Sequence, residues 1–429
     1  MLVIYSIAYS LGFIAMLPLF LLRHEKYASG FRERLGHHPE FKQDDRKVIW
    51  LHCVSVGETN AARPLVDELI RQFPAHRLVM STTTRTGQKL AKGIFRDKAD
   101  AVFYFPFDWK FSVRRALKTF RPSLILLMET EIWPRFISEA KRSGSKVAIV
   151  NGRLSQRSFA RYSRIRFLIS RILRLVDRAL MQTSGDAERV VSLGMDAIKV
   201  HVTGNLKFES TFDETNGLVK ELRSRFGVSS EKPMIIAAST HEPEERLVLE
   251  SLDGELGYSC RLMIAPRHPE RFDAVERLLE ESSLPFVRRT SPASEADKTV
   301  PVILLDTIGE LRDVYPLAEI VFVGGSLIPH GGQSVLEPAA AGRAIVTGPY
   351  TANFDAVLRE FVESEAVRQT PIAPDDHQIS ERLFEEFILL LENHQLRLEL
   401  GQNAAAVMKK YDRGATARTI EFLSEITDN

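Results

Sequence analysis

The most informative stretch of this 429-residue chain is Val48-Ile-Trp-Leu-His-Cys-Val-Ser-Val-Gly57-Glu58. Its apolar part predicts a buried parallel strand, and Gly57 permits a sharp turn where a side chain would crowd the backbone. Helical periodicity follows from Thr59 to Phe73, so we expect Glu58 at a helix N-terminus, where open α/β sheets bind ligands. A carboxylate ionises readily at such a terminus, and there it either caps the helix or acts as a general base.

From this stretch onward, strand patterns alternate with helix patterns, and the alternation falls into two series along the chain. This predicts an α/β protein with two doubly wound domains, each built on a parallel sheet. The strands expected in the first domain are Val48–Val54, Arg77–Thr82, Ala101–Phe105, Leu124–Met128, Lys146–Asn151, Arg178–Gln182 and Lys199–Val202. After a break at Ser210–Gly217, the second series is expected at Met234–Ala238, Arg261–Ala265, Pro285–Arg288, Val302–Leu305, Ile320–Val323 and Ala344–Thr347. We expect the ligand sites of both domains to face a cleft between them.

The chain is too long for a single core, which also favours two domains. The expected divisions are a membrane anchor at 1–22, a first Rossmann-like domain at 23–209, a linker at 210–228, a second Rossmann-like domain at 229–405, and a C-terminal helix at 406–429 that packs back toward the first domain.

Charge and cysteine content argue against several classes of protein. The 57 basic residues nearly balance the 56 acidic ones, so no overall field draws the chain onto nucleic acid, and we expect no such partner. The two cysteines, Cys53 and Cys260, lie far apart, which indicates a reducing compartment rather than a disulfide scaffold. No cysteine and histidine spacing resembles a zinc site.

The N-terminus is the exception to a water-soluble composition. Met1–Leu22 carries no charge, and a helix of that length at about 1.5 Å per residue just crosses a bilayer core of about 30 Å. Basic residues follow at once, so the positive-inside bias keeps the rest of the chain in the cytoplasm. We expect an uncleaved anchor, or a segment lying in the membrane interface. A cleaved signal peptide is the alternative, but no basic residue precedes the apolar run and no small-residue cleavage site follows it.

Two further polar groups are expected in the first domain. Glu129 and Glu131 end the apolar strand Leu124–Met128, and because charges are rarely buried without partners, this strand end is expected to face a polar cleft. A pair of helix caps is the alternative. Lys207, in Gly204-Asn205-Leu206-Lys207-Phe208, is placed to meet an anion, although alone it is an ordinary surface lysine.

The second domain places four loops after strands, which together predict a nucleotide site. Arg267 offers a guanidinium fork for phosphate or carboxylate, and Glu337, about one turn inside a helix, is suited to ribose hydroxyls. Free backbone N–H groups in the glycine-rich turn would bind an anion. The four loops are 239–245, 266–271, 306–311, and the glycine-rich pair 323–326 and 331–338.

A basic amphipathic stretch runs from Arg153 to Arg178 and holds eight arginines with aromatic and aliphatic residues between them. Such a stretch suits an anionic membrane surface or a phosphorylated lipid. The alternative is a solvated helix face whose apolar side belongs to the core.

Five motifs occur in an order that resembles the 3-deoxy-D-manno-octulosonic acid (Kdo) transferases of lipid A biosynthesis. They are Ser55-x-Gly57-Glu58, Met128-Glu129-Thr130-Glu131-x-Trp133-Pro134, Gly204-Asn205-Leu206-Lys207-Phe208, Pro266-Arg267-His268-x-Glu270-Arg271 and Gly331-Gly332-x-x-x-Leu336-Glu337-Pro338. The resemblance implies a GT-B glycosyltransferase, with the lipid acceptor on the first domain and the donor CMP-Kdo on the second. It also implies an inner-membrane location, with the catalytic domains on the cytoplasmic side and a phosphorylated lipid A precursor as partner.

Carried over by position, the resemblance makes Glu58 the general base, with Glu129 and Lys207 supporting the transition state. The residues it implies for CMP are Pro266, Arg267, Ile308, Gly309, Glu310, Ser334, Val335, Leu336 and Glu337. One departure is Gln333-Ser334, where the family usually has His-Asn.

The residues and the resemblance together predict an inverting displacement with no cofactor. No Asp-x-Asp pair is present, and fixed donors near Lys207, Arg267 and Ser334 can meet the single leaving phosphate, so no metal is expected. The alternative is magnesium held by Glu129 and Glu131. Two other functions remain open: a GT-B enzyme that uses another nucleotide sugar, and a membrane-associated nucleotide-sugar-binding protein without turnover.

Overall fold

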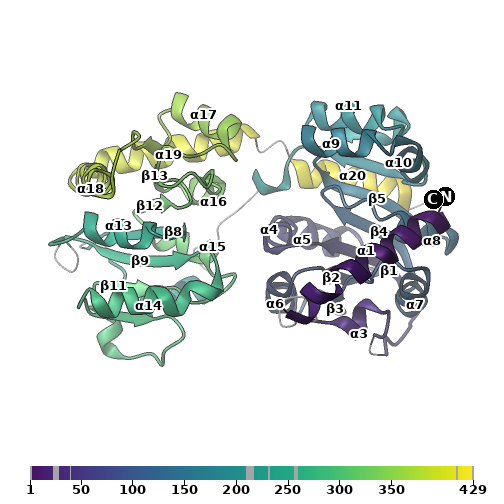
Figure 1. Cartoon of the computed structure of the whole chain (residues 1–429), viewed down its shortest axis with the longest axis horizontal. Helices are drawn as coiled ribbons and strands as arrows, with labels where there is room; N and C mark the ends of the chain where they lie inside the picture. Colours follow the sequence, from purple (N-terminus) through teal and green to yellow (C-terminus); the bar gives the residue numbers. More distant parts are fainter. Residues whose placement is uncertain are drawn as a thin grey trace. The chain divides into compact units, whose positions relative to one another are not determined.

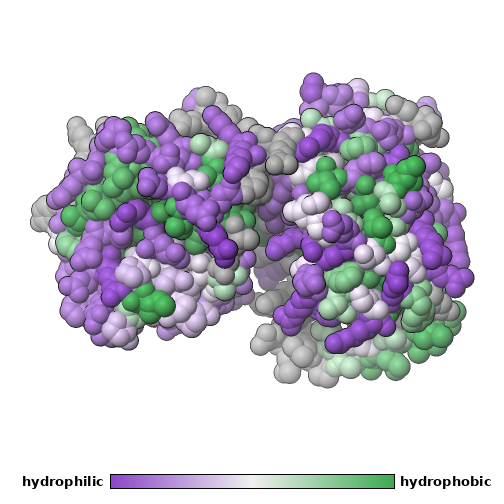
Figure 2. Space-filling model, turned by 90° about the horizontal axis from the view of Figure 1, so that it is seen from above, coloured by the Kyte–Doolittle hydropathy of each residue, from purple (hydrophilic) through white to green (hydrophobic). Residues whose placement is uncertain are grey.

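The computed structural model describes residues 2–22, 29–38, 40–208, 217–229, 232–255, 259–411 and 414–427. The chain divides into two compact units, and each is described by itself. Unit 1 comprises Met1–Glu209 and Asp412–Asn429, and unit 2 comprises Ser210–Tyr411. In the view of Figure 2, both units present mostly hydrophilic surface with separate hydrophobic patches.

Unit 1 is built on a seven-stranded sheet in the order β3-β2-β1-β4-β5-β6-β7. All of its neighbouring strands are parallel. Because the chain leaves the middle of the sheet in both directions, the switch point lies between β1 and β4. The strands are β1 (Lys47–Cys53), β2 (His76–Thr82), β3 (Ala101–Tyr104), β4 (Pro122–Met128), β5 (Lys146–Gly152), β6 (Arg178–Met181) and β7 (Val200–Val202).

Helices cover both faces of this sheet (Figure 1). They are α1 (Leu2–Leu22), α3 (Phe31–Arg34), α4 (Val56–Ala61), α5 (Arg63–Gln72), α6 (Arg85–Ile94), α7 (Lys110–Phe120), α8 (Pro134–Arg142), α9 (Gln156–Ser163), α10 (Arg166–Leu173), α11 (Ser184–Ser192) and α20 (Ala415–Thr427), with 3₁₀ turns η1 (Ala197–Lys199) and η2 (Leu206–Phe208).

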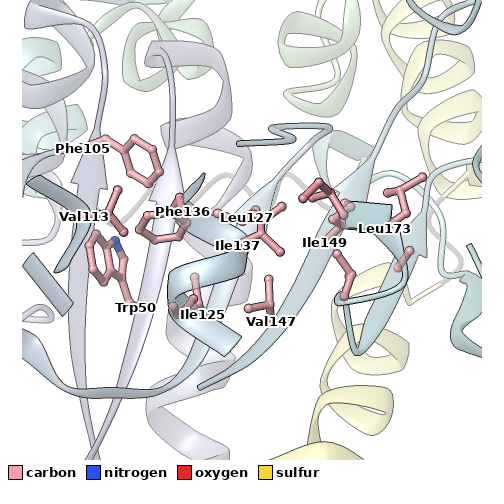
Figure 3. Packing of buried hydrophobic residues seen from close by; sticks show 14 of the residues in the cluster. Trp50, Phe105, Val113, Ile125, Leu127, Phe136, Ile137, Val147, Ile149 and Leu173 are labelled. Atoms are coloured by element: carbon pink, nitrogen blue, oxygen red, sulfur yellow. The ribbon is translucent and has the colours of Figure 1, made fainter. Parts of the chain in front are cut away.

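The core of unit 1 lies in two layers, because alternate strand residues point to opposite faces. Trp50 packs with Phe103, Phe120 and Phe136 on one face, and Figure 3 shows it beside Val113 and Phe136 at one end of this cluster. Its indole Nε1 donates to Ser81 Oγ at 2.7 Å, so the buried polar atom has a partner. On the other face, buried residues of β1, α5 and α20 belong to a second hydrophobic cluster.

Unit 2 repeats this architecture with the sheet order β10-β11-β9-β8-β12-β13-β14, again parallel throughout. Its switch point lies between β8 and β12. The strands are β8 (Met234–Thr240), β9 (Arg261–Pro266), β10 (Phe286–Arg288), β11 (Val302–Leu304), β12 (Ile320–Val323), β13 (Ala344–Thr347) and β14 (Arg368–Gln369). The helices are α12 (Gly217–Arg225), α13 (Glu244–Ser251), α14 (Phe272–Glu281), α15 (Leu311–Val314), α16 (Leu336–Ala340), α17 (Asp355–Glu363), α18 (Asp376–Glu392) and α19 (His394–Tyr411), with 3₁₀ turns η3 (Pro269–Arg271), η4 (Glu295–Lys298) and η5 (Tyr315–Leu317).

All strands predicted from the sequence are present, with ends within one or two residues of the prediction, and β14 is an additional two-residue strand. The prediction of one continuous helix at 59–73 is wrong. The helical segment begins at Val56 and is divided at Ala62 into two helices, α4 and α5. Pro64 explains the break, because its ring cannot donate the amide hydrogen bond that a continuous helix needs. Glu58 therefore lies in the first turn of α4, whose N-cap is Ser55.

The predicted end of the first domain at residue 209 agrees with the unit boundary, but two other divisions differ. Part of the expected linker is the helix α12, which buries Val219 and Leu222 and joins unit 2 through an Arg225–Asp297 ion pair of 2.8 Å. The stretch 406–411, expected in the returning helix, is the end of α19 and belongs to unit 2. The return is made by α20, yellow in Figure 1, which buries its apolar face in unit 1.

The N-terminal helix α1 packs on unit 1 along one face. Tyr5 Oη donates to Asp108 Oδ2 at 2.8 Å, and Trp109 Nε1 donates to Ser10 Oγ at 3.0 Å. The aliphatic residues of its other face are exposed: Val3, Ile4, Ile7, Leu11 and Ile14. In the part of the chain that the structure describes, no helix combines the length and the apolar character needed to cross a membrane.

Candidate active site

Glu58 lies where β1 ends, at the switch point of the unit 1 sheet. Its side chain is buried, with 8% of its surface exposed. Its Oε2 accepts from the amide of Val54 at 2.7 Å, and its Oε1 accepts from Ser55 Oγ at 3.3 Å. Glu58 accepts a hydrogen bond from the backbone directly before Ser55, the N-cap of α4. It therefore retains part of the capping role that the sequence left open.

The environment of Glu58 changes its acidity. Burial raises the pKa of Glu58 to about 7; the amide of Val54 opposes this rise, and the negative charges of Glu129 and Glu131 add to it. A carboxylate with a pKa near neutrality is present in both forms at physiological pH and returns a captured proton readily. A simple helix cap needs no such shift.

Glu129 and Lys207 form an ion pair in unit 1, with 2.9 Å between Oε1 and Nζ. Glu129 follows β4 with a φ of 56°, in the left-handed region that few non-glycine residues adopt. Lys207 lies in η2, beyond β7. Since the carboxyl ends of parallel strands meet at one edge, the sheet brings together two groups that are 78 positions apart.

Asn151 was missed as a site residue. It lies near the end of β5 with a φ of 52°, and its Oδ1 accepts from the amide of Leu206 at 3.0 Å. This bond holds η2 and therefore the backbone of Lys207. An asparagine followed by a glycine at a predicted strand end was the available signal, because asparagine tolerates the left-handed region.

Glu131 is engaged by Trp133, whose Nε1 donates to Oε2 at 2.8 Å. Burial raises the pKa of Glu131, the Trp133 bond opposes this, and the charge of Glu129 adds to it. Within the described residues, no group of three or more histidine, cysteine, aspartate or glutamate side chains is arranged to hold a metal ion. Glu129 and Glu131, the pair considered for magnesium, are bonded to Lys207 and Trp133 respectively.

In unit 2 the switch point is held by Glu244, which the sequence placed only in a candidate loop. Its carboxylate accepts from four backbone amides, those of His241, Gly325, Ser326 and Leu327, at 2.6 to 3.0 Å. These bonds join the loop after β8 to the loop after β12. Gly324 is required between them, because a Cβ there would lie 2.7 Å from Ser239 O and from Thr240 Cα.

Arg267 follows β9, and its backbone amide donates to Thr240 O at 3.0 Å. Its side chain is exposed and forms no hydrogen bond or ion pair with any residue that the structure describes. The nearby Arg271, in contrast, pairs with Glu242 at 2.7 Å and with Glu245 at 3.0 Å. Arg267 is therefore the guanidinium available to an anionic ligand, as its place beside Pro266 in the motif suggested.

The loop after β11 contains Ile308, Gly309 and Glu310, all half-buried. Gly309 has a φ of 93°, which requires a glycine. The Glu310 carboxylate accepts from Arg289 Nε at 3.0 Å and from Thr307 Oγ1 at 2.8 Å, so its position is fixed by two partners.

The glycine-rich turn differs from the prediction in two respects. The amides of Gly332 and Gln333 donate to Gly325 O at 2.7 Å and Gly324 O at 3.1 Å, so they are not the free donors that the sequence suggested. Ser334 and Glu337 are half-buried, whereas Val335 and Leu336 are buried. Glu337 lies in the first turn of the five-residue helix α16, not one turn inside a longer helix.

The basic stretch 153–178 forms α9 and α10. Ile169, Ile172 and Leu173 are buried in the core, as the structural alternative required, but Phe167 is 70% exposed. Asp177, the one acidic residue of the stretch, pairs with Lys141 at 2.7 Å. The exposed Arg166 and Arg171 therefore lie in the same helix as an exposed aromatic ring.

Comparison with known proteins identifies the family. Residues 29–210 match the family described as 3-deoxy-D-manno-octulosonic-acid transferase (kdotransferase). The chain is 34% identical to the 3-deoxy-D-manno-octulosonic acid transferase of Haemophilus influenzae, over 96% of this chain and 94% of that protein. A crystal structure of the C-terminal CMP-Kdo binding domain of WaaA from Acinetobacter baumannii also matches, at 31% sequence identity and a TM-score of 0.40. The match covers 44% of this chain and 94% of the chain in that structure.

The fold of two parallel α/β units is shared more widely. The structure of UDP-GlcNAc 2-epimerase from Neisseria meningitidis matches with a TM-score of 0.57 at 15% sequence identity. The match covers 88% of this chain and 100% of the epimerase chain. This likeness shows a fold of the kind found in GT-B glycosyltransferases. The sequence identity over nearly the whole length places the chain among the 3-deoxy-D-manno-octulosonic acid transferases.

Proposed function

We propose that this transferase moves Kdo from CMP-Kdo to a sugar hydroxyl of a phosphorylated lipid A precursor, with Glu58 as the general base. The observation that carries the proposal is the buried Glu58 carboxylate at the unit 1 switch point, whose pKa is raised to about 7. The acceptor oxygen attacks the anomeric carbon of Kdo, its proton passes to Glu58, and the bond from that carbon to the phosphate oxygen breaks. CMP leaves as a monophosphate, and the configuration inverts.

Glu129 and Lys207 support this step as a pair. The ammonium of Lys207, held at 2.9 Å from Glu129, offers a positive charge to the negative charge that develops on the leaving group. The carboxylate of Glu129 keeps that ammonium in place and contributes to the raised pKa of Glu58. Both roles depend on the pair being intact.

The donor belongs to unit 2 in this proposal. Arg267 binds the phosphate through its guanidinium fork, and the loops at Ile308–Glu310 and Ser334–Glu337 hold the nucleoside. Because Arg267 provides a fixed positive charge for the single leaving phosphate, the proposed reaction uses no metal and no cofactor.

Membrane attachment is part of the proposal, and α1 is its basis. The exposed aliphatic ridge formed by Val3, Ile4, Ile7, Leu11 and Ile14 suits a helix lying in the membrane interface while its other face packs on unit 1. The arginines around Phe167 would face anionic lipid or the acceptor phosphates. Unit 1 then acts at the cytoplasmic face of the inner membrane.

The test is release of CMP from CMP-Kdo, measured with and without the lipid acceptor. Release that depends on the acceptor, and that Glu58→Gln abolishes, supports the proposal. Acceptor-dependent release from another nucleotide sugar, but not from CMP-Kdo, would overturn the choice of donor. Tight CMP-Kdo binding without any release would identify a binding protein instead.

A further inference from the structure

We propose that Asn151 is a positioning residue for the reaction, because its side chain fixes the 3₁₀ turn η2 and so holds the ammonium of Lys207 in its catalytic position. The inference rests on the proposed function, in which Lys207 supports the transition state. It goes further by assigning a measurable share of the rate to a buried side chain of β5 that belongs to none of the five motifs.

The side chain of Asn151 binds the segment that carries Lys207. Its Oδ1 accepts from the amide of Leu206, the first residue of η2, at 3.0 Å and across 55 positions of sequence. The Leu206 side chain is 1% exposed and belongs to the second hydrophobic cluster. The next amide, that of Lys207, donates to Asn205 Oδ1 at 3.0 Å within the same segment. Asn151 therefore supplies the support that η2 receives from another strand.

The other member of the ion pair is tied to the same strand end. The amide of Glu129 donates to Val150 O at 2.9 Å, and Val150 directly precedes Asn151. The backbone of β5 thus receives Glu129, and the next side chain along β5 receives η2. The distance of 2.9 Å between Lys207 Nζ and Glu129 Oε1 depends on both of these bonds.

The backbone at this strand end has an uncommon conformation. The φ of Asn151 is 52°, and the φ of Glu129 on the adjacent strand end is 56°, so both residues lie in the left-handed region. Such conformations persist where neighbouring groups fix them, and they concentrate at functional sites. Here Gln182 Nε2 donates to Asn151 O at 3.0 Å. A conformation that costs free energy is therefore kept at both strand ends that place the ion pair.

An asparagine fits this position better than an aspartate does. Asn151 is 0% exposed, and its Nδ2 has no hydrogen-bond partner among the described residues, which is a cost in free energy. Aspartate would accept the same bond without an unpaired donor, but it would bury a second negative charge on the strand end next to Glu129. The neutral amide holds η2 without competing with Glu129 for the ammonium of Lys207.

The experiment is a double-mutant cycle, read as the kcat of acceptor-dependent CMP release on the high-pH plateau. Asn151→Gly keeps the left-handed backbone but removes the acceptor, and alone it should lower kcat about tenfold through a displaced ammonium. In the Lys207→Ala background the same change should lower kcat by less than about twofold, because the group that Asn151 holds is then absent. KM for CMP-Kdo should stay within about twofold, because the donor is proposed to bind unit 2.

Ser283→Gly is the matched control, because Ser283 is exposed and has a φ of 58°. It should change neither kcat nor KM. Asn151→Ser, whose hydroxyl is too short to reach the amide of Leu206, is the second variant if the glycine chain does not fold. It should show the same loss of kcat, and the same lack of a further loss when combined with Lys207→Ala.

Equal losses of kcat with and without Lys207 would make the Asn151 bond a purely structural one and overturn the inference. An unchanged kcat in Asn151→Gly or in Asn151→Ser would also overturn it, as would a raised KM for CMP-Kdo at constant kcat. The proposed function fails separately, if the wild-type chain releases no CMP in the presence of acceptor.

Discussion

The ammonium of Lys207 lies 2.9 Å from the carboxylate of Glu129, although the two residues belong to different motifs 78 positions apart. The pair stands at the same sheet edge as Glu58, whose pKa the charge of Glu129 raises. One edge of unit 1 thus holds a buried carboxylate that titrates near neutrality and a positive charge fixed by a salt bridge. The first three predictions below depend on these relationships.

Replacing Glu58 by glutamine should lower turnover by about 10²–10⁴-fold, the usual loss when a general base is removed. Glutamine keeps the shape and can still accept from the amide of Val54, so the fold should survive. CMP affinity should not change. Turnover and melting temperature are measured on one preparation, with the exposed Glu188→Gln of α11 as the control. A fully active but destabilised Glu58→Gln would leave only the capping role.

The rate should depend on pH through the same group. A base must be deprotonated, so kcat/KM should rise with pH up to about 7 and then level off. Glu129→Gln removes a negative charge that raises the pKa of Glu58, so the rise should move to lower pH. The measurement is the pH profile of kcat/KM for the acceptor in both proteins, with the acceptor below its KM and CMP-Kdo saturating. An identical midpoint in the two profiles would contradict the coupling.

The free energy of unfolding should depend on pH through Glu58 in the opposite sense to that expected for a salt-bridged carboxylate. The folded-state pKa, about 7, is above the unfolded value of 4.5, so the stability associated with protonated Glu58 is fully present below pH 4.5 and is lost as pH rises through 7. A shift of this size corresponds to a loss on the order of 3 kcal/mol. Glu58→Gln cannot ionise, so its melting temperature should rise relative to wild type between pH 5 and pH 8. A constant difference across that range would show that Glu58 is not shifted.

Replacing Arg267 by alanine should weaken CMP binding by about ten- to a hundredfold, as expected when a charged hydrogen-bonding group is lost, without unfolding unit 2. Its side chain is exposed and unpaired among the described residues, so no internal contact is removed. Lysine should restore the affinity only partly, because it lacks the planar fork. Titration calorimetry with CMP measures this, and Arg277→Ala on α14 is the matched control. Unchanged CMP affinity would place Arg267 outside the donor site.

Charging the exposed ridge of α1 should release the protein from membranes. Ile7→Glu combined with Leu11→Glu alters side chains that are 56% and 63% exposed, so α1 should stay on unit 1. We expect weaker sedimentation with anionic vesicles and lower turnover on vesicle-borne acceptor, but unchanged turnover on a detergent-dispersed one. Deleting residues 1–22 should give the same pattern in a folded, partly soluble protein, since no catalytic motif lies there. Full activity of the double variant on vesicles would refute interfacial attachment.

The sequence alone predicted the two parallel sheets and the loops that carry Glu58, Glu129, Lys207 and Arg267. Strand patterns are local: an apolar run with a turn residue after it identifies a strand and its end without knowledge of any partner. The helix after β1 was predicted as continuous because the apolar periodicity of residues 59–73 continues across Ala62. The helical hydrogen bonding is interrupted there, because Pro64 has no amide proton to donate. β14 was missed because a strand of two residues is too short to show an alternation of apolar and polar side chains.

The properties that make these residues a site came only from the tertiary structure. The burial that raises the pKa of Glu58, the Lys207–Glu129 salt bridge and the four amides around Glu244 are contacts between segments far apart in the chain. A single apolar segment is likewise compatible with spanning a bilayer or lying on a domain, and only the bonds of α1 to Asp108 and Trp109 show which of its faces packs on unit 1. Local pattern specifies which groups reach a sheet edge, but the charge, pairing and solvent exposure of a group depend on what the folded chain packs against it.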